Sequence, residues 1–242
     1  MTKIFAHRGA SAYAPENTME AFALAVKQGA DGIELDVQMT KDGQVVVIHD
    51  ETIDRVSDKK GAVRDYTLEE LRKFSFSNHM EKYKDAAIPT LKEVLEFLKP
   101  TKLELNIELK TGIYWYSGLE EKTMELVKEA GMENRVIYSS FNHYSIQKIL
   151  ELDSNAQCAY LYSDVFLNVD KYAKETGVCG LHPAVYHLKM PAFLKEYQES
   201  GLKIRVWTVN KKEDMETFIK ADLEAIITNY PDKALEVRRL LS

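Results

Sequence analysis

The stretch IELDVQMTKDGQVVVIHD contains two mainly apolar runs that are separated by polar residues. Two β-branched runs, Ile33–Val37 and Val45–Ile48, flank a turn at Gly43, and this pattern predicts a β-hairpin. Alternate side chains of a strand share one face, so Glu34 and Asp36 are expected to point the same way. Two adjacent carboxylates are costly to bury unless a cation lies between them. The stretch therefore indicates either a metal site or an exposed strand face.

Short apolar strands recur along the rest of the chain and alternate with helices. The first strand, Lys3–Ala6, precedes a helix that Asn17 is expected to cap and that ends at Gly29; capping is preferred over a catalytic role for Glu16 and Asn17. With the hairpin's first arm counted once, eight strands centre near residues 4, 35, 106, 137, 159, 180, 206 and 226. Eight βα units in 242 residues favour a closed (β/α)8 TIM barrel over an open doubly wound sheet.

One segment interrupts this alternation. Residues 51–89 are polar and charged, with one short helix expected at Thr67–Phe74. A segment of this length between core elements is usually functional or an insertion. We therefore expect one barrel domain over residues 1–242, with a small lid-like insertion at about residues 51–89. The alternation resumes with a capping box that opens a helix at Thr90.

In a (β/α)8 barrel the chemistry lies at the carboxyl ends of the strands, so residues far apart in the sequence are expected to share one rim. Glu104 begins its strand and is expected at the opposite end, in a structural role. His182 is expected on the rim, also in a structural role. The residues that we interpret as one site are two histidines, three carboxylates and two cationic side chains: His7, Arg8, Glu34, Asp36, His49, Glu108 and Lys110.

The donor set indicates the chemistry. Three carboxylates without a cysteine ligand suit a hard divalent cation, Mg²⁺ or Ca²⁺, better than Zn²⁺. Their charges, together with those of the cation, Arg8 and Lys110, leave a positive site that suits a phosphodiester. His7 and His49 titrate near neutrality and can divide the roles of acid and base, in an order that the sequence leaves open. Metal-assisted phosphodiester cleavage is the interpretation that uses all of these groups.

Eight short motifs carry a more specific resemblance. They run from residue 7 to residue 231: His7-Arg8-Gly9, Glu16-Asn17-Thr18, Glu34-x-Asp36, His49-Asp50, Ile88-Pro89-Thr90-Leu91, Glu108-x-Lys110, Trp207-Thr208-Val209-Asn210 and Thr228-Asn229-Tyr230-Pro231. In their order and spacing the chain resembles the glycerophosphodiester phosphodiesterases. The resemblance implies a (β/α)8 barrel with an insertion after the second strand. It also implies hydrolysis of glycerophosphodiesters to glycerol 3-phosphate and an alcohol such as choline, ethanolamine or glycerol.

The same resemblance implies roles for individual residues. Glu34, Asp36 and Glu108 would hold the divalent cation. The remaining roles would be phosphate binding by Arg8 and Lys110, acid–base catalysis by His7 and His49, and contact with the glycerol by Trp207. The nucleophile stays open between water and the neighbouring glycerol hydroxyl.

The bulk composition limits the partners. A formal charge of −6 and a pI near 5.6 argue against a general nucleic-acid or anionic-membrane surface. The sequence shows no apolar signal segment and no run long enough to span a bilayer, and Cys158 and Cys179 lack metal-ligand spacing. A cytoplasmic protein is therefore expected. Its expected partner is a small glycerophosphodiester substrate, without nucleic acid or stable membrane insertion, and its oligomeric state is not predicted.

Two other functions fit part of the pattern. A barrel that uses Mg²⁺ to stabilise an enediolate would use three carboxylates and one base, but it would not need Arg8 or a second histidine. A catalytically inactive, phosphodiester-binding barrel would be marked by the loss of a histidine or a carboxylate, and none is missing. The aromatic loop at residues 114–116 is expected to pack against the insertion rather than to form a cage for a quaternary ammonium group.

Overall fold

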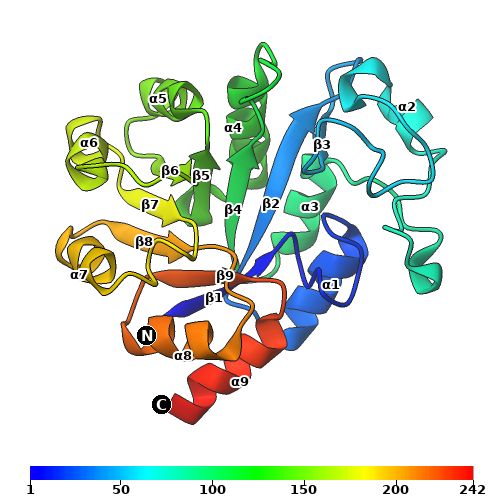
Figure 1. Cartoon of the computed structure of the whole chain (residues 1–242). Coiled ribbons are helices and arrows are strands. Elements are labelled where there is room, and N and C mark those ends of the chain that lie inside the picture. The colour runs from blue at the N-terminus through cyan, green and yellow to red at the C-terminus, as the bar shows by residue number, and fades with distance from the viewer. Residues whose placement is uncertain (242) are drawn as a thin grey trace.

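Eight parallel strands form a closed barrel in the computed structural model, which describes residues 1–241 (Figure 1). The order around the barrel is β1, β9, β8, β7, β6, β5, β4 and β2, and the pairing of β1 with β2 closes it. This confirms the TIM-barrel prediction. The strands are β1 (Lys3–His7), β2 (Gly32–Met39), β4 (Glu104–Leu109), β5 (Val136–Ser140), β6 (Gln157–Tyr162), β7 (Gly180–Pro183), β8 (Lys203–Val206) and β9 (Ala225–Thr228).

Helices between the strands cover the outside of the barrel. Their apolar faces pack on outward side chains such as Leu35 and Val37, because apolar burial is the main favourable term in folding. In residues 1–241, no helix is long and apolar enough to cross a membrane. The helices are α1 (Met19–Gln28), α3 (Leu91–Leu98), α4 (Leu119–Ala130), α5 (His143–Leu152), α6 (Val169–Glu175), α7 (Pro191–Glu199), α8 (Lys212–Lys220) and α9 (Pro231–Leu241). Helix α4 was not predicted.

The predicted hairpin is present. Strand β3 (Val45–Val47) runs antiparallel to β2 outside the barrel, and the turn uses a positive φ of 77° at Gly43, which glycine adopts without strain. After β3, the backbone N–H of Ile48 donates to the carbonyl of Asp36 at 3.0 Å. The hairpin thus returns the chain to the end of β2 and brings His49 beside the two carboxylates of that strand.

The segment after β3 has a small hydrophobic cluster of its own. It contains η1 (Val63–Asp65), α2 (Leu68–Leu71) and η2 (Glu81–Tyr83), and it extends beyond the end of β2 (Figure 1). The expected helix is shorter than predicted, although Thr67 caps it by accepting a hydrogen bond from Glu70 N. The division of the chain into one domain with an insertion stays a prediction. The buried cluster comprises Val46, Ile48, Ile53, Val56, Val63, Leu71, Phe76 and Ile88.

Two polar residues of the barrel strands lie away from the rim. Lys3 Nζ contacts Glu104 Oε1 at 2.7 Å and Glu224 Oε1 at 3.0 Å near the amino ends of the strands, so Glu104 has the expected structural place. His182 does not lie on the rim. Its side chain is fully buried in the barrel, and burial holds its pKa well below the ordinary value.

Candidate active site

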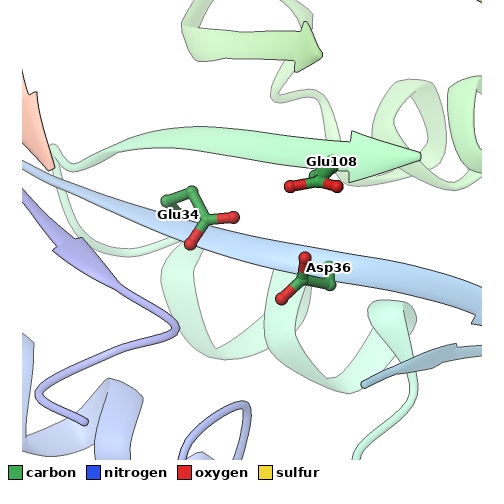
Figure 2. Close-up of side chains that lie close together, drawn as sticks. All are labelled: Glu34, Asp36 and Glu108. Atoms are coloured by element: carbon green, nitrogen blue, oxygen red, sulfur yellow. The ribbon is translucent and has the colours of Figure 1, made fainter. Parts of the chain in front are cut away.

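Three carboxylates meet inside the barrel and face one another (Figure 2). Alternation along β2 turns Glu34 and Asp36 inward, and the parallel register places Asp36 directly opposite Glu108 of β4. One oxygen atom from each residue lies within 4.8 Å of the other two, and all three side chains are buried. The strand pairing alone therefore creates the acidic cluster.

Burial opposes the ionisation of these carboxyl groups. It raises the pKa of Glu34 well above the ordinary value, and the charges of Asp36 and Glu108 raise it further. Burial also raises the pKa of Glu108, against the opposing charge of Lys110. The pKa of Asp36 would be raised by burial as well, but cations, Arg8 foremost, hold it well below its usual range.

The cluster fits a divalent cation. Within residues 1–241, the buried Oδ1 atom of Asp36 has no hydrogen-bond partner. Buried oxygens that repel one another and include an unpartnered atom are stabilised by a hard cation, and carboxylate oxygens are the ligands that Mg²⁺ and Ca²⁺ prefer. The structure thus brings the three predicted metal ligands together into a set that could bind a divalent ion.

Two cationic side chains flank the cluster. Arg8 follows β1 with a positive φ of 56°, and its backbone N–H donates to the carbonyl of Glu34 at 2.8 Å. The Arg8 Nε atom lies 3.3 Å from Asp36 Oδ2. On the other side, Lys110 Nζ donates to Glu108 Oε1 at 2.9 Å. Each cation keeps further N–H donors, which could bind an anion next to the carboxylates.

His7 stands at the end of β1 with an amide partner. Its Nδ1 atom lies 2.6 Å from Asn229 Oδ1, an acceptor, so Nδ1 carries the proton and Nε2 has a free lone pair. Nε2 points toward the acidic cluster, 3.9 Å from Glu34 Oε2. Burial and the charge of Arg8 lower the pKa of His7 to about 4. The imidazole is therefore neutral at pH 7.

His49 has a carboxylate partner instead. Its Nδ1 atom lies 2.6 Å from Asp50 Oδ1. The hydrogen bond from His49 and the contact with Arg55 hold the pKa of Asp50 well below its usual range. The carboxylate is thus ionised and can accept a hydrogen bond from Nδ1 of His49. The two histidines of the site consequently have different partners, a neutral amide for His7 and a carboxylate for His49.

A cavity of about 310 Å³ connects these groups. One wall is apolar: the rings of Trp207 and Phe141 pack edge to face at 5.6 Å, and the indole N–H of Trp207 donates to the carbonyl of His182 at 2.7 Å. Asp36 and Lys110 are not part of the lining, but they pair with Arg8 and Glu108, which are. The lining residues are His7, Arg8, Glu34, His49, Asn106, Glu108, Phe141, Leu161, Trp207 and Ile227.

The helix-capping role expected for Glu16 and Asn17 is wrong. Thr18 caps α1 by accepting a hydrogen bond from Ala21 N, whereas Asn17 has a positive φ of 56° and donates from Nδ2 to Asp36 Oδ2 at 2.8 Å. Glu16 accepts from Arg8 Nη1 at 2.9 Å. Both residues therefore belong to the surroundings of the site, and the motif that they form with Thr18 was the signal for it.

The aromatic loop after β4 packs as expected. The guanidinium of Arg64, in the segment after β3, lies 3.6 Å from the centroid of the Tyr114 ring. Tyr116 is buried, and its hydroxyl donates to Gln38 Oε1 at 2.8 Å. Trp115 is exposed. Two of the three aromatic residues are thus engaged in packing.

Comparisons with known proteins identify the family of the chain. Residues 7–233 match the family model described as the glycerophosphoryl diester phosphodiesterase family. A glycerophosphodiester phosphodiesterase of Caldanaerobacter subterraneus is 43% identical over 239 residues, with 98% of each chain covered. The crystal structure of a glycerophosphodiester phosphodiesterase from Agrobacterium tumefaciens has 29% identity and a TM-score of 0.84, covering 98% of this chain and 100% of that one.

A further solved structure carries a product. It is a phosphodiesterase from Oleispira antarctica in complex with sn-glycerol-3-phosphate, with 27% identity and a TM-score of 0.84, covering 98% of this chain and 96% of that one. The similarity in these comparisons extends over nearly the whole barrel. The chain therefore belongs to the glycerophosphoryl diester phosphodiesterase family and is a phosphodiester hydrolase.

Proposed function

We propose that the protein hydrolyses glycerophosphocholine, glycerophosphoethanolamine and glycerophosphoglycerol to glycerol 3-phosphate and an alcohol. One observation carries the proposal: two histidines, Arg8 and two of the three clustered carboxylates line one cavity, and Asp36 and Lys110 are ion-paired to members of that lining. The Oleispira antarctica structure, which holds glycerol 3-phosphate as product, supports this substrate class. The cavity volume of about 310 Å³ also lies in the range of small-molecule sites.

The proposed cofactor is a divalent cation, Mg²⁺ or Ca²⁺, held by Glu34, Asp36 and Glu108. When bound, the cation supplies positive charge that stabilises the negative charge developing on the phosphoryl oxygens. Arg8 and Lys110 bind the phosphate from either side with the N–H donors that their carboxylate partners leave free. Because these donors are already oriented by ion pairs, little reorganisation is needed when the substrate arrives.

We assign the base role to His7 and the acid role to His49. His7 is neutral, and its hydrogen bond to Asn229 leaves Nε2 free to accept a proton from the nucleophile, whether water or the glycerol hydroxyl. His49 is hydrogen-bonded through Nδ1 to the carboxylate of Asp50, which orients the ring so that its other nitrogen can protonate the departing alcohol oxygen. The assignment follows from the two partners, an amide in one case and a carboxylate in the other.

Trp207 is proposed to contact and recognise the glycerol group of the substrate. Its ring forms an apolar wall with Phe141, against which the carbon backbone of glycerol can lie while the phosphate meets Arg8. An enediolate-forming enzyme would leave Arg8 and His49 without a role, and phosphodiester hydrolysis uses both. The proposed acid–base assignment and the residues that line the cavity therefore both favour phosphodiester hydrolysis.

Product analysis tests the proposal. Purified protein is incubated with glycerophosphocholine and Mg²⁺ or Ca²⁺, and the products are followed by phosphorus NMR for the phosphate esters and by proton NMR for the free alcohols. We expect glycerol 3-phosphate and choline in equal amounts. Formation of phosphocholine and glycerol, or no turnover of any of the three glycerophosphodiesters with either cation, would overturn the proposal.

A further inference from the structure

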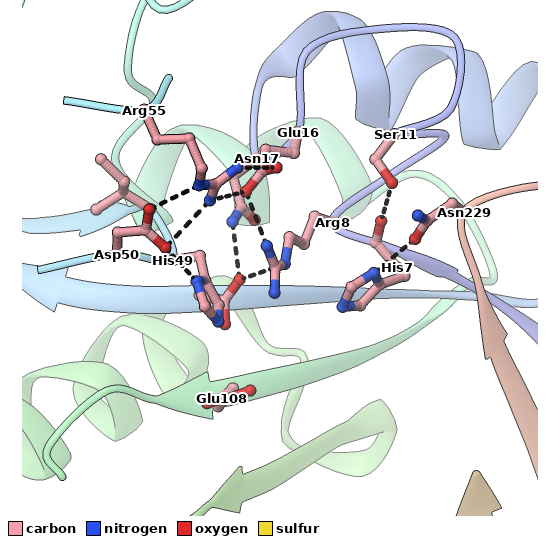
Figure 3. A network of polar contacts seen from close by, with 12 residues as sticks. His7, Arg8, Ser11, Glu16, Asn17, His49, Asp50, Arg55, Glu108 and Asn229 are labelled. Carbon is pink, nitrogen blue, oxygen red and sulfur yellow. Dashed lines mark hydrogen bonds and ion pairs between the residues drawn. The ribbon is translucent and has the colours of Figure 1, made fainter. Parts of the chain in front are cut away.

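Arg55 joins two carboxylates that come from different loops (Figure 3). Its Nε and Nη2 atoms donate to the two carboxylate oxygens of Asp50, at 2.7 and 3.1 Å. Its Nη1 and Nη2 atoms donate to the two oxygens of Glu16, at 2.7 and 2.8 Å. The planar guanidinium thus makes two bidentate contacts at once, a geometry that the single ammonium group of lysine cannot reproduce.

Each of these carboxylates has a second partner in the site. Glu16 accepts from Arg8 Nη1 at 2.9 Å, and Asp50 Oδ1 lies 2.6 Å from His49 Nδ1. Arg55 therefore occupies the centre of a continuous polar chain that runs from His49 to Arg8. Arg55 does not line the cavity, so it can influence the reaction only through its partners.

The two ends of this chain are held with different firmness. The Arg8 end is anchored, because Glu16 is largely buried and Arg8 is also held by Asp36 at 3.3 Å. At the other end, Gln38 Nε2 donates to the backbone carbonyls of His49 and Asp50, but the side chain of Asp50 has fewer supports. In residues 1–241, the ion-pair partners of Asp50 are its neighbour His49 and Arg55. Arg55 is thus the link that ties Asp50 to the anchored side.

We propose that Arg55 is a positioning residue: it ties Asp50 to Glu16 and thereby fixes the imidazole of His49 relative to the phosphate-binding Arg8. The proposal rests on the function proposed above for this site. Without Arg55, the Asp50 carboxylate loses two of its hydrogen bonds and can turn away, and the His49 ring turns with it. Misplacing a proton donor by about 1 Å lowers a rate by about a hundredfold, and loss of a supporting contact typically lowers activity by about 10–100-fold.

An exposed ion pair could instead serve stability alone, and the side chain of Arg55 is 45% exposed. The chain offers a matched control for this alternative. Arg72 lies in the same segment, is 44% exposed and pairs with Glu93 at 2.5 Å, but Glu93 belongs to the capping box that Thr90 forms at the start of α3 and does not line the cavity. Arg72→Met thus removes the ion pair of a similarly exposed arginine that has no link to His49.

The experiment compares kcat, KM and melting temperature for Arg55→Met, Arg55→Lys, Asp50→Asn, the double variant of Arg55→Met with Asp50→Asn, and Arg72→Met. We expect Arg55→Met to lower kcat by about 10–100-fold with KM within about threefold, because Arg8 keeps its other partners. Arg55→Lys should recover part of kcat. The double variant should be no slower than the slower single variant, since both act through His49.

A second readout does not depend on turnover. The Nδ1 proton of His49 forms a short hydrogen bond with Asp50, so we expect it to give a low-field signal in the proton NMR spectrum. This signal should be absent in His49→Gln. Arg55→Met should shift or broaden it, and Arg72→Met should not. The proposal would be overturned if Arg55→Met left the NMR signal unchanged or kept kcat within twofold of wild type. It would also be overturned if the effects of the two substitutions on kcat multiplied in the double variant. If wild-type protein turns over no glycerophosphodiester, the proposed function fails, and the NMR signal alone decides the role of Arg55.

Discussion

Replacing Glu34 by glutamine is expected to stabilise the metal-free protein and to remove its response to divalent cations. Glu34 is 4% exposed and lies within 4.8 Å of two other carboxylates. Two unit charges at 4.8 Å repel by about 3 kcal/mol at an effective dielectric constant of about 20. Protonation relieves part of this repulsion in the wild-type protein. The free energy of unfolding should therefore rise by about 1–3 kcal/mol in Glu34→Gln without metal.

The wild-type protein should show the opposite behaviour when cations are added. A cation at about a hundredfold its Kd adds about 2.7 kcal/mol to the free energy of unfolding, and each kcal/mol moves the melting temperature of a chain of this size by about 2–4 °C. The cation should thus raise the wild-type Tm by about 5–10 °C. Glu34→Gln should show only a small rise, because one of three charged ligands is lost.

Thermal unfolding near neutral pH measures both effects, once in excess chelator and once with Mg²⁺ or Ca²⁺. Glu120→Gln is a suitable control, because Glu120 is a fully buried carboxylate that contacts Lys148, outside the site. This control should keep the shift caused by the cation. If Glu34→Gln were less stable than wild type in chelator and still gained several degrees from the cation, the interpretation of the cluster would be refuted.

Three further predictions concern pH, proton transfer and substrate binding. The folded-state pKa of Glu34 is raised above its ordinary value of 4.5. The metal-free wild-type protein should therefore lose stability as the pH rises from about 4.5 through the raised pKa. Unfolding of Glu34→Gln, measured as a function of pH, should lack this loss. His7→Ala and His49→Ala should each lower kcat by about 10²–10⁴-fold. With a p-nitrophenyl ester of glycerol phosphate, whose leaving group needs no proton, only the defect of His49→Ala should shrink; an equal defect on both substrates would contradict its role as acid. Trp207→Ala should raise KM for all three natural glycerophosphodiesters. The kcat/KM values of the wild-type protein for these substrates should agree within about tenfold. A change in KM confined to the choline ester would contradict the contact of Trp207 with the glycerol.

The sequence was sufficient to predict what depends on local periodicity. Alternation in Ile33–Val37 placed Glu34 and Asp36 on one face, and the barrel fold then brought Glu108 beside them, because parallel strands end on the same rim. The ends of the predicted strands also gave the histidines and the cationic residues, and the resemblance to the family then implied their individual roles. Predicting these features requires only the direction in which alternate side chains of a strand point and the order of the strands. Both can be inferred from short stretches of the sequence.

Contacts between loops could not be predicted in the same way. Arg55 contacts Glu16 across 39 positions of the sequence, and no periodic pattern relates the two residues. Asn17 looked like a helix cap because capping is the commonest role of such a residue, but Thr18 takes that role and frees Asn17 for Asp36. The prediction that His182 lies on the rim was wrong. The depth of a residue in the barrel depends on the tilt and stagger of the strands, which the sequence does not show.

The dependence of turnover on a divalent cation is the most direct test of the proposed mechanism. Purified protein is stripped of metal, its metal content is checked by elemental analysis, and hydrolysis of glycerophosphocholine is measured while Mg²⁺ or Ca²⁺ is titrated back. We expect no turnover in excess chelator and a saturable recovery with added cation, which Glu34→Gln should fail to show. Full turnover by protein shown to be free of metal would contradict the role of Glu34, Asp36 and Glu108 as ligands of a required cation.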